Sequence, residues 1–542
     1  MNRTQLLFLV LTWLSCVTIT CAQSLTIATQ PTDLPNELSS MALLGSSGNG
    51  RYFYGALSGR GFAFDTKTGK YAIYGNETTT CEVVGISSDG WSLLQTAPAG
   101  EQSGLSNGVV LVPLDSTNGE HSIFVTSPDP DHPYFTLWHL TSDAKYFCGT
   151  ILNSGWESIP VIGERNADGK SYKVSTLPVP DKDPLGTTPQ QFRLIYVSED
   201  GATLVGFLVE ESGNLATVMT YQRKADGTYG IQFPADDVLF DHSITVPPFP
   251  EYDDYVTATS DPDDPNYDEK KLQEQKDAYN KACDEYYRLF DLFSRNLALK
   301  QHSLAVGGKG RYALVTVVEN GVDDEGFRFT KAVKYLSVDL TSGKAELVNY
   351  PEGTSEEVNP RDLLGEQREL LYAAPVGGSR YWDAFVYTHD QKTLSLVEWA
   401  KRETQQDFST FYSMPDPVSG ESTIHTGWPE VSLDGKTVTL LGYPNEAFKT
   451  YRNSYFRFGQ SILPIAPVCG AMKQGLRFDG ELLHVAEPSC IYLFNAQGEL
   501  LYQSAQTTQL DMAPLRHTLP QGDYIVLAVG AQGNSASLKL SL

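Results

Sequence analysis

The sequence predicts an all-β protein: a β-propeller of about seven blades, with a helical insertion and a small C-terminal β-sandwich. A hairpin-like motif returns along most of the chain, a second hairpin-like element follows its copies, and the period is roughly 40 to 60 residues. The clearest copy is Val197–Gly206. Here Asp-Gly is expected to supply the two positive-φ positions of a tight type I′ turn, and a β-rich run follows it.

The related copies share a polar turn followed by an aromatic or β-rich run: Ser47–Gly55, Ser87–Trp91, Ser142–Gly149, Gly307–Tyr312 and Val431–Val438. Their turn positions, at 49, 89, 143, 200, 309 and 434, are 40, 54, 57, 109 and 125 residues apart. Each of the last two gaps is about twice as long as a typical earlier one. One contains an insertion, and the other is expected to hide a degraded copy near Leu371–Gly377, which gives about seven units.

The second hairpin-like elements are Gly61–Lys70, Tyr221–Tyr229, Tyr335–Lys344 and Ala384–Lys392. Two hairpins per period make one four-stranded blade. A single blade cannot bury both faces, but blades packed around an axis can, and closure of the ring leaves only short edges exposed. A row of β-sandwich modules is the alternative, but it needs about 100 residues per unit and does not fit this spacing.

The N-terminus, residues 1–22, reads as a signal peptide. Arg3 supplies the positive n-region, Leu6–Leu14 is apolar, and a small residue precedes the expected cleavage site before Gln23. The residues before Cys16 and Cys21 match a lipoprotein signal poorly, so free secretion or cell-surface localisation is favoured. No later apolar run approaches the roughly 20 residues that span a bilayer, and the mature chain is expected to lack a transmembrane segment.

Bulk composition narrows the function classes. The chain has 542 residues, 41% hydrophobic and 20% charged, which is ordinary for a folded protein and argues against wholesale disorder. The formal net charge of -26 repels phosphate backbones and anionic lipids, so nucleic acid is not an expected partner.

The cysteines do not form a recognisable framework. Five remain after the leader, an odd and widely spaced set: Cys81, Cys148, Cys283, Cys469 and Cys490. Cys469 with Cys490 is the one pair expected to be worth testing for a disulfide. None lies in a C-x-x-C, which argues against structural zinc.

The insertion is expected over about residues 236–299. It begins with a Pro- and Asp-rich stretch that should be extended. A helix with one apolar, aromatic face follows, formed by Leu272, Tyr279, Ala282, Tyr286, Phe290, Phe293 and Leu297. We expect this face to pack against the side or rim of the propeller; a partner-binding helix is the alternative.

The last segment, residues 465–542, changes character. Ile491–Tyr502 reads as strand, turn, strand, and the alternation and turns of the segment predict a small antiparallel sandwich. Its Leu-Pro-x-Gly-x-Tyr-Ile-Val element (Leu519–Val526) and its Lys-Leu-x-Leu ending (Lys539–Leu542) resemble the C-terminal sorting domain of the type IX secretion system of Bacteroidota. The turn motif is also similar to the Ser-x-Asp-Gly repeats of extracellular propellers in these bacteria.

The resemblance implies crossing of the outer membrane by the type IX secretion machinery. It also implies removal of the tail, and attachment to surface polysaccharide or release. An ordinary terminal β-sandwich is the alternative.

No catalytic, cofactor-binding or metal-binding residue is assigned. Gly104–Gly108 matches G-x-S-x-G, but a nucleophile elbow needs a helix after Ser106, and Val109–Pro113 reads as a strand. Ser87–Trp91 has the wrong spacing for a sialidase Asp box.

Two acidic groups could suggest a metal. Asp261, Asp263, Asp264 and Asp268 offer calcium-type oxygen ligands, but prolines break the loop geometry of an EF-hand. Asp129, Asp131 and His132 read as a solvated loop.

The chain contains 29 tyrosines. We expect Tyr52, Tyr54, Tyr146 and Tyr312 to fill the space between blades; the alternative is an aromatic ligand-binding surface. The favoured function is binding of a glycan, peptide or host protein at the axial face, where the blade loops converge. The alternatives are an extracellular hydrolase, glycosidase or peptidase, on the same fold, and a structural or adhesive surface protein. An enzyme should have an axial pocket with converging acids of perturbed pKa, whereas a binding protein should have an aromatic or polar surface there.

Overall fold

The computed structural model separates into two compact units, one ending at Pro464 and one beginning at Ile465. It describes residues 25–541, except for residues 58, 99–107, 116–120, 183, 185–190, 210–214, 301–302, 324–327, 377–381, 416–421, 443, 446–449, 465–475, 479–481, 496–499, 513, 516–518, 520–522 and 531–534.

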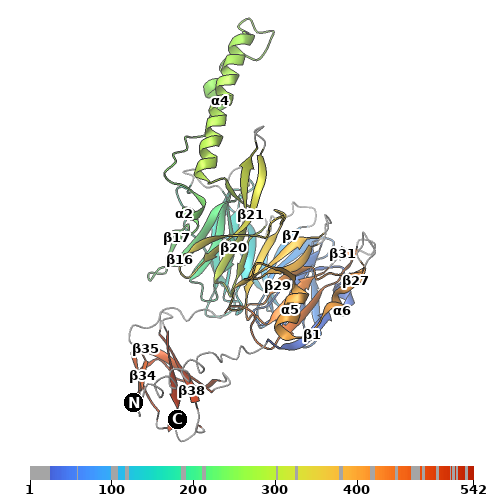
Figure 1. Ribbon diagram of the computed structural model, residues 1–542, viewed down its shortest axis with the longest axis vertical. Coiled ribbons are helices and arrows are strands. Elements are labelled where there is room, and N and C mark those ends of the chain that lie inside the picture. The colour runs from blue at the N-terminus through green and yellow to red at the C-terminus, as the bar shows by residue number, and fades with distance from the viewer. Residues whose placement is uncertain are drawn as a thin grey trace, which may run out of the picture. The chain divides into compact units, whose positions relative to one another are not determined.

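The first unit is an all-β propeller (Figure 1). Its described strands form seven blades, as the repeat predicts. Blades 1 to 3 are β2–β5 (Ala42–Ser46, Tyr52–Leu57, Arg60–Asp65, Tyr71–Tyr74), β6–β9 (Thr79–Ile86, Trp91–Pro98, Gly108–Pro113, Ile123–Val125) and β10–β13 (Tyr134–Leu140, Tyr146–Leu152, Ser158–Arg165, Tyr172–Thr176). Blade 4 is β14–β17 (Gln191–Val197, Thr203–Val209, Leu215–Arg223, Tyr229–Gln232), and blade 5 is β19–β22 (Ala305–Gly307, Tyr312–Val322, Arg328–Asp339, Ala345–Asn349). Blade 6 is β23–β26 (Asn359–Leu364, Glu369–Pro375, Trp382–Tyr387, Thr393–Ser395).

The ring closes by joining the two ends of the propeller. Blade 7 consists of β29 (Trp428–Val431), β30 (Thr437–Leu441) and β33 (Ser454–Phe458), with β1 (Ile27–Asp33) as its outermost strand. Ile27 pairs with Phe458 and Asp33 pairs with Ser454. Because the first strand completes the last blade, the ladder hydrogen bonds of β1 hold the ring shut.

Short elements connect the blades or, within blade 7, lie between β30 and β33. They are the 3₁₀ helix η1 (Asn36–Leu38), the helices α5 (Leu396–Thr404) and α6 (Ser409–Tyr412), and the strands β18 (Leu297–Leu299), β27 (Ser413–Pro415), β28 (Ser422–Ile424), β31 (Pro444–Asn445) and β32 (Thr450–Tyr451). Strand β18 pairs with both β16 and β20, so blades 4 and 5 share one nine-stranded sheet.

The recurring turn differs from the predicted type I′ turn. Gly201 has a φ of 69°, but the φ of Asp200 is not positive. Gly201 N–H donates to Ser198 O, and Ser198 N–H donates to Thr203 O. This is a four-residue loop with one left-handed position. Ser198 Oγ also donates to Asp200 and accepts from the Thr203 amide, so side chains replace the second left-handed residue in holding the loop closed.

Tyrosines of one blade pack beneath the turn glycines of the next, as expected of residues that fill the space between blades. Tyr52, Tyr146 and Tyr312 are buried, and Tyr54 is partly buried against Cys81 and Val83 of blade 2. A Cβ on Gly201 would meet the Tyr146 ring at 2.7 Å, and one on Gly90 would meet the Tyr52 ring at 3.1 Å. The glycines therefore permit close approach between blades as well as a left-handed backbone.

The insertion contains the short helices α2 (Asp236–Leu239) and α3 (Tyr252–Tyr255) and the long helix α4 (Glu269–Phe293), which extends away from the propeller (Figure 1). The expectation that its aromatic face packs against the propeller is confirmed only at the end of the helix, where Phe293 lies in the core of blades 4 and 5 and stacks on Phe240. Along the rest of α4 the expectation is wrong, because the face packs against the preceding Pro-rich segment: Phe249 contacts Tyr286, and Tyr252 contacts Tyr279. Leu297, expected in the helix, lies in β18.

The second unit is an antiparallel β-structure of six described strands: β34 (Leu476–Phe478), β35 (Leu482–Asn495), β36 (Leu500–Gln503), β37 (Thr507–Asp511), β38 (Asp523–Gly530) and β39 (Ser535–Ser541). The predicted strand–turn–strand over Ile491–Tyr502 corresponds to β35 and β36. The long strand β35 pairs with β34 and β37 through its first part and with β36 and β38 through its second part. Leu483, Ile491 and Val526 lie in the hydrophobic core of this second unit. In the described part of the chain, no helix is long and apolar enough to cross a membrane.

Candidate functional site

Each blade places its first strand next to the propeller axis, and five of these strands contain a register shift. In β10 the pairing steps from Leu137 to His139, and in β14 it steps from Leu194 to Tyr196. The residues at the shifts are Leu44, Val84, Trp138, Ile195 and Arg361. All five line one cavity. The bulges therefore turn corresponding side chains toward the axis.

Glycines in the second strands make room for three of these irregularities. A Cβ on Gly55, Gly149 or Gly206 would lie within 3.0 Å of a backbone carbonyl in the innermost strand of the same blade. Only glycine allows that approach.

The axial cavity has a volume of about 1360 Å³ and is lined by the innermost strands of all seven blades. Glu82, Thr136 and Arg193 occupy equivalent positions in blades 2, 3 and 4, each two residues before the bulge. All three line the cavity. By this equivalence we infer that the three side chains face the channel at one depth, with the Glu82 carboxylate and the Arg193 guanidinium on either side of Thr136.

Two arginines in the channel differ in their partners. Arg361 forms an ion pair with Glu430 and lies 4.9 Å above the Trp428 ring. The Arg193 side chain has no ion-pair or hydrogen-bond partner among the residues that the structure describes. Burial lowers the pKa of both groups, that of Arg361 to about 10. A guanidinium in this state remains charged at neutral pH, so Arg193 presents an uncompensated cation to the channel.

Glu82 is the corresponding unpaired anion. Its side chain is exposed to the channel, and no cation lies within ion-pair distance of it in the described chain. Partial burial among the channel walls raises its pKa. Burial also lowers the pKa of His139, which lines the same cavity, to about 4, so this imidazole is neutral at physiological pH.

Blade 3 contributes two exposed indoles to the channel wall. Trp138 sits at the bulge of β10 and is 45% exposed, and Trp156, in the loop after β11, is 42% exposed. Over the described residues, neither indole N–H has a hydrogen-bond partner and neither ring stacks on another aromatic side chain. Both indoles are therefore available to a ligand.

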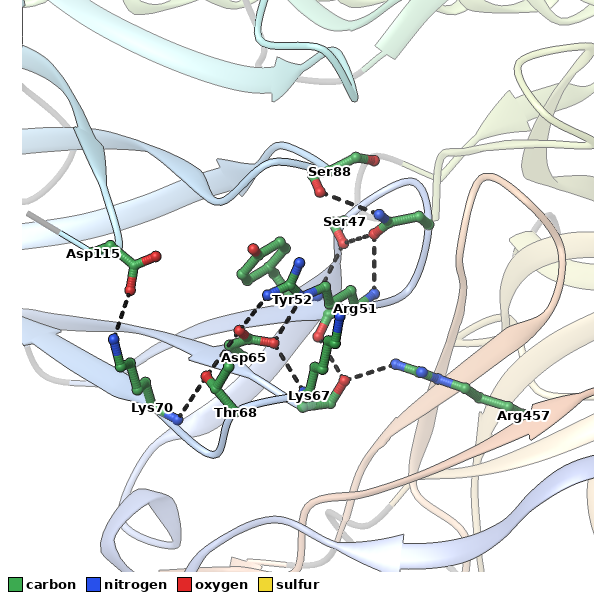
Figure 2. A network of polar contacts seen from close by, with 12 residues as sticks. Ser47, Arg51, Tyr52, Asp65, Lys67, Thr68, Lys70, Ser88, Asp115 and Arg457 are labelled. Atoms are coloured by element: carbon green, nitrogen blue, oxygen red, sulfur yellow. Dashed lines mark hydrogen bonds and ion pairs between the residues drawn. The ribbon is translucent and has the colours of Figure 1, made fainter.

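The turn loops at one end of the blades form a network that keeps neighbouring blades in register. Asp434 N–H donates to Gly48 O, Asn49 Nδ2 donates to Ser88 O, and Ser88 N–H donates to Ser142 O. In blade 1, Arg51 binds Asp65 with its Nε and Nη2 atoms at 3.0 and 2.7 Å, and Arg457 of blade 7 donates to Thr66 Oγ1 at 2.9 Å (Figure 2). This network fixes the channel wall and serves a structural role.

Other acids with perturbed pKa values have structural partners, although one of them, Asp362, also lines the channel. Burial raises the pKa of Asp362 to about 7, although its carboxylate accepts the N–H groups of Gly308 and Leu363 and so joins blades 5 and 6. Asp383 pairs with His425 Nδ1 at 3.0 Å, an arrangement that catalytic dyads also use, but both residues are only 5% exposed and neither lines the channel.

Of the described residues singled out in the sequence, Tyr54 lines the channel, whereas the two acidic groups do not. Ser106 lies outside the described residues, and β8 does follow it as a strand. Asp261 and Asp264 accept hydrogen bonds from nearby backbone amides, and Asp268 caps α4. Asp129 pairs with His132 at 2.9 Å within its own loop. Cys469 is outside the described residues, so its pairing with Cys490 stays a prediction.

One further acidic group lies in the insertion. Asp236, Asp237 and His242 bring three possible ligand atoms within 4.8 Å of one another, but His242 Nε2 already pairs with Asp236 at 2.9 Å. The candidate site residues that sequence reasoning missed are Glu82, Trp138, Trp156 and Arg193. One signal was present: Thr136 and Arg193 stand thirteen positions before the closing glycines Gly149 and Gly206 of their repeats.

No protein-family model matches the chain, and no curated protein sequence matches it. Among solved structures, prolyl oligopeptidase B from Galerina marginata is similar over 76% of this chain and 46% of its own, at 10% identity and a TM-score of 0.37. The periplasmic gluconolactonase PpgL of Pseudomonas aeruginosa is similar over 65% of this chain and 83% of its own, at 12% identity and a TM-score of 0.32. TolB from Acinetobacter baumannii is similar over 86% of this chain and 79% of its own, at 9% identity and a TM-score of 0.27. The fold itself, an all-β propeller, rests on the strand pairing described above.

Proposed function

We propose that this protein is an exported propeller that binds a glycan, peptide or protein in its axial channel. The observation that carries the proposal is the channel wall itself, which combines two exposed indoles with an unpaired arginine and an unpaired glutamate. Desolvated aromatic and arginine side chains supply much of the energy at binding sites. Groups left without partners inside the protein gain most from a ligand that satisfies them.

The signal-peptide pattern and the C-terminal motifs support export. We propose that residues 1–22 direct the chain across the inner membrane and that residues 465–542 direct it through type IX secretion to the cell surface or medium. The propeller, residues 23–464, is then the working part. This is tested by the intact mass of the protein recovered from the medium and the cell surface of its source organism. A chain that still ends at Leu542 would contradict the sorting role.

Channel binding is tested by probing arrays of glycans and of peptides with the full chain and with a Trp138→Ala variant. The proposal predicts ligands whose signal falls when Trp138 is removed. A matched control is Phe124→Ala, because Phe124 is 76% exposed on the outer strand of blade 2 and lies outside the channel wall. Signals that persist unchanged in Trp138→Ala would contradict binding in the channel. Turnover of an array ligand that is lost in Glu82→Gln would instead indicate a hydrolase.

A further inference from the structure

Trp156 is held in a backbone conformation that large side chains avoid. Its φ is 66°, in the left-handed region. The loop enforces this: Trp156 N–H donates to Asn153 O, while Asn153 Oδ1 accepts the N–H groups of Gly155 and Glu157. Asn153 Nδ2 also donates to Glu157 at 2.6 Å.

A loop that needs one left-handed residue ordinarily takes glycine or asparagine there. A tryptophan at this position, 42% exposed at the channel wall, gains little from packing that would explain its strain. Strained residues held by their surroundings cluster at ligand sites. Trp156 and Trp138 belong to the same blade, with Trp138 at the bulge within β10 and Trp156 in the loop that follows β11.

The unpaired charged side chains of the channel indicate which chemical groups a ligand would place beside these rings. The free guanidinium of Arg193 has the fork geometry that binds a carboxylate through two parallel hydrogen bonds. The Glu82 carboxylate offers hydrogen-bonding oxygens to hydroxyl groups. A peptide that bound by strand addition would need a regular free edge, and the bulges at Val84, Trp138 and Ile195 interrupt the innermost strands that border the channel.

We propose that the channel ligand is an acidic saccharide, a chain of sugar rings bearing carboxylates, with ring faces stacked on Trp138 and Trp156 and a carboxylate on Arg193. This inference rests on the proposed function and names the ligand class of that site. The cavity of about 1360 Å³ exceeds the roughly 300–1,000 Å³ typical of small-molecule pockets, as several linked rings require.

The test uses the full chain and three probes in titration calorimetry: tetragalacturonate, a neutral tetragalactoside and tetraglutamate. We expect tetragalacturonate to bind most tightly. Arg193→Gln should weaken it by about tenfold to a hundredfold, the effect of losing a hydrogen-bonded charge, while changing tetragalactoside binding little. Arg193→Lys should bind tetragalacturonate with an affinity between those of the parent chain and Arg193→Gln, because lysine keeps the charge but lacks the forked guanidinium.

Trp156→Asn should weaken both saccharides by about tenfold or more, since asparagine tolerates the left-handed backbone but offers no ring. Trp156→Tyr should retain part of the affinity. An unchanged thermal midpoint would show that each variant is folded, and Phe124→Ala should bind like the parent chain. Tetragalacturonate binding that is absent, or insensitive to Arg193→Gln, would overturn the proposal. Tight binding of tetraglutamate alone would overturn the saccharide class and leave channel binding intact, whereas array signals indifferent to Trp138→Ala would remove channel binding itself.

Discussion

In blades 3 and 4 the repeated turn places one residue in the left-handed region, and Ala144 and Gly201 are the equivalent occupants of that place. Gly201 has a φ of 69° and Ala144 a φ of 54°. Replacing Gly201 by alanine and Ala144 by glycine should change the free energy of unfolding by unequal amounts. We expect Gly201→Ala to destabilise the propeller strongly and Ala144→Gly to be nearly neutral.

The magnitudes follow from the surroundings. A left-handed alanine costs about 1 kcal/mol relative to glycine. At Gly201 the new Cβ would also lie 2.7 to 2.9 Å from three ring atoms of Tyr146, which is 2% exposed and held by a hydrogen bond to Glu164. Such overpacking costs about 1 to 3 kcal/mol, which gives a total of about 2 to 4 kcal/mol. At Ala144 the relief of about 1 kcal/mol is offset by the loss of one buried methyl group, about 0.8 kcal/mol.

Urea unfolding followed by far-ultraviolet circular dichroism measures both changes, compared at a common m-value. A loss below about 1 kcal/mol for Gly201→Ala would refute the close packing of tyrosine against turn glycine. A loss above about 2 kcal/mol for Ala144→Gly would show that its methyl group matters more than its backbone strain.

Three further predictions concern the rest of the propeller. Arg51 holds the pKa of Asp65 well below its usual range, so the stability from this carboxylate is present above a pH of about 4 and is lost as the pH falls below it. Asp65→Asn should therefore lower the free energy of unfolding by about 3 kcal/mol at neutral pH and flatten the acid side of a curve of stability against pH. An unchanged acid side would contradict this. Replacing residues 243–292 by a short Gly-Ser linker should leave a folded propeller, because the two ends of the deleted segment are already joined by the hydrogen bond from Asp241 N–H to Phe293 O at 2.7 Å. Loss of cooperative thermal unfolding would show that the insertion stabilises the propeller. Burial raises the pKa of Cys81 to about 12 and also raises the pKa of Cys148, so an aromatic disulfide reagent should label half-buried Cys283 in the native chain and these two only after unfolding. Labelling is mapped by mass spectrometry, and fast labelling of Cys148 in the native chain would contradict its assignment to the core.

The blade count and the second hairpins could be predicted from sequence because turn chemistry and alternation are local properties. The type I′ assignment was wrong because Asp-Gly alone does not set loop length. Ser198 and Thr203 close a longer loop through hydrogen bonds that span several residues.

The position of α4 was mispredicted for a similar reason. Its apolar face was evident, but which partner covers such a face depends on tertiary structure, and the aromatic residues of the preceding segment are its partner.

The channel residues were harder to find. Glu82 and Arg193 are ordinary charges in ordinary strands, and only the ring brings three neighbouring blades to one axis. The closing glycines Gly149 and Gly206 were an indication in the sequence, since each lies against the backbone carbonyl of a channel-lining residue, Thr136 or Arg193. Their role was hidden because a glycine at the end of a turn motif has a simpler explanation in the turn itself.

A crystal structure of the full chain grown with tetragalacturonate tests the central claim, ligand binding in the axial channel, most directly. The account predicts density for sugar rings against Trp138 and Trp156, with a carboxylate at the Arg193 guanidinium. Saccharide bound on another surface, with the channel holding only water, would contradict it.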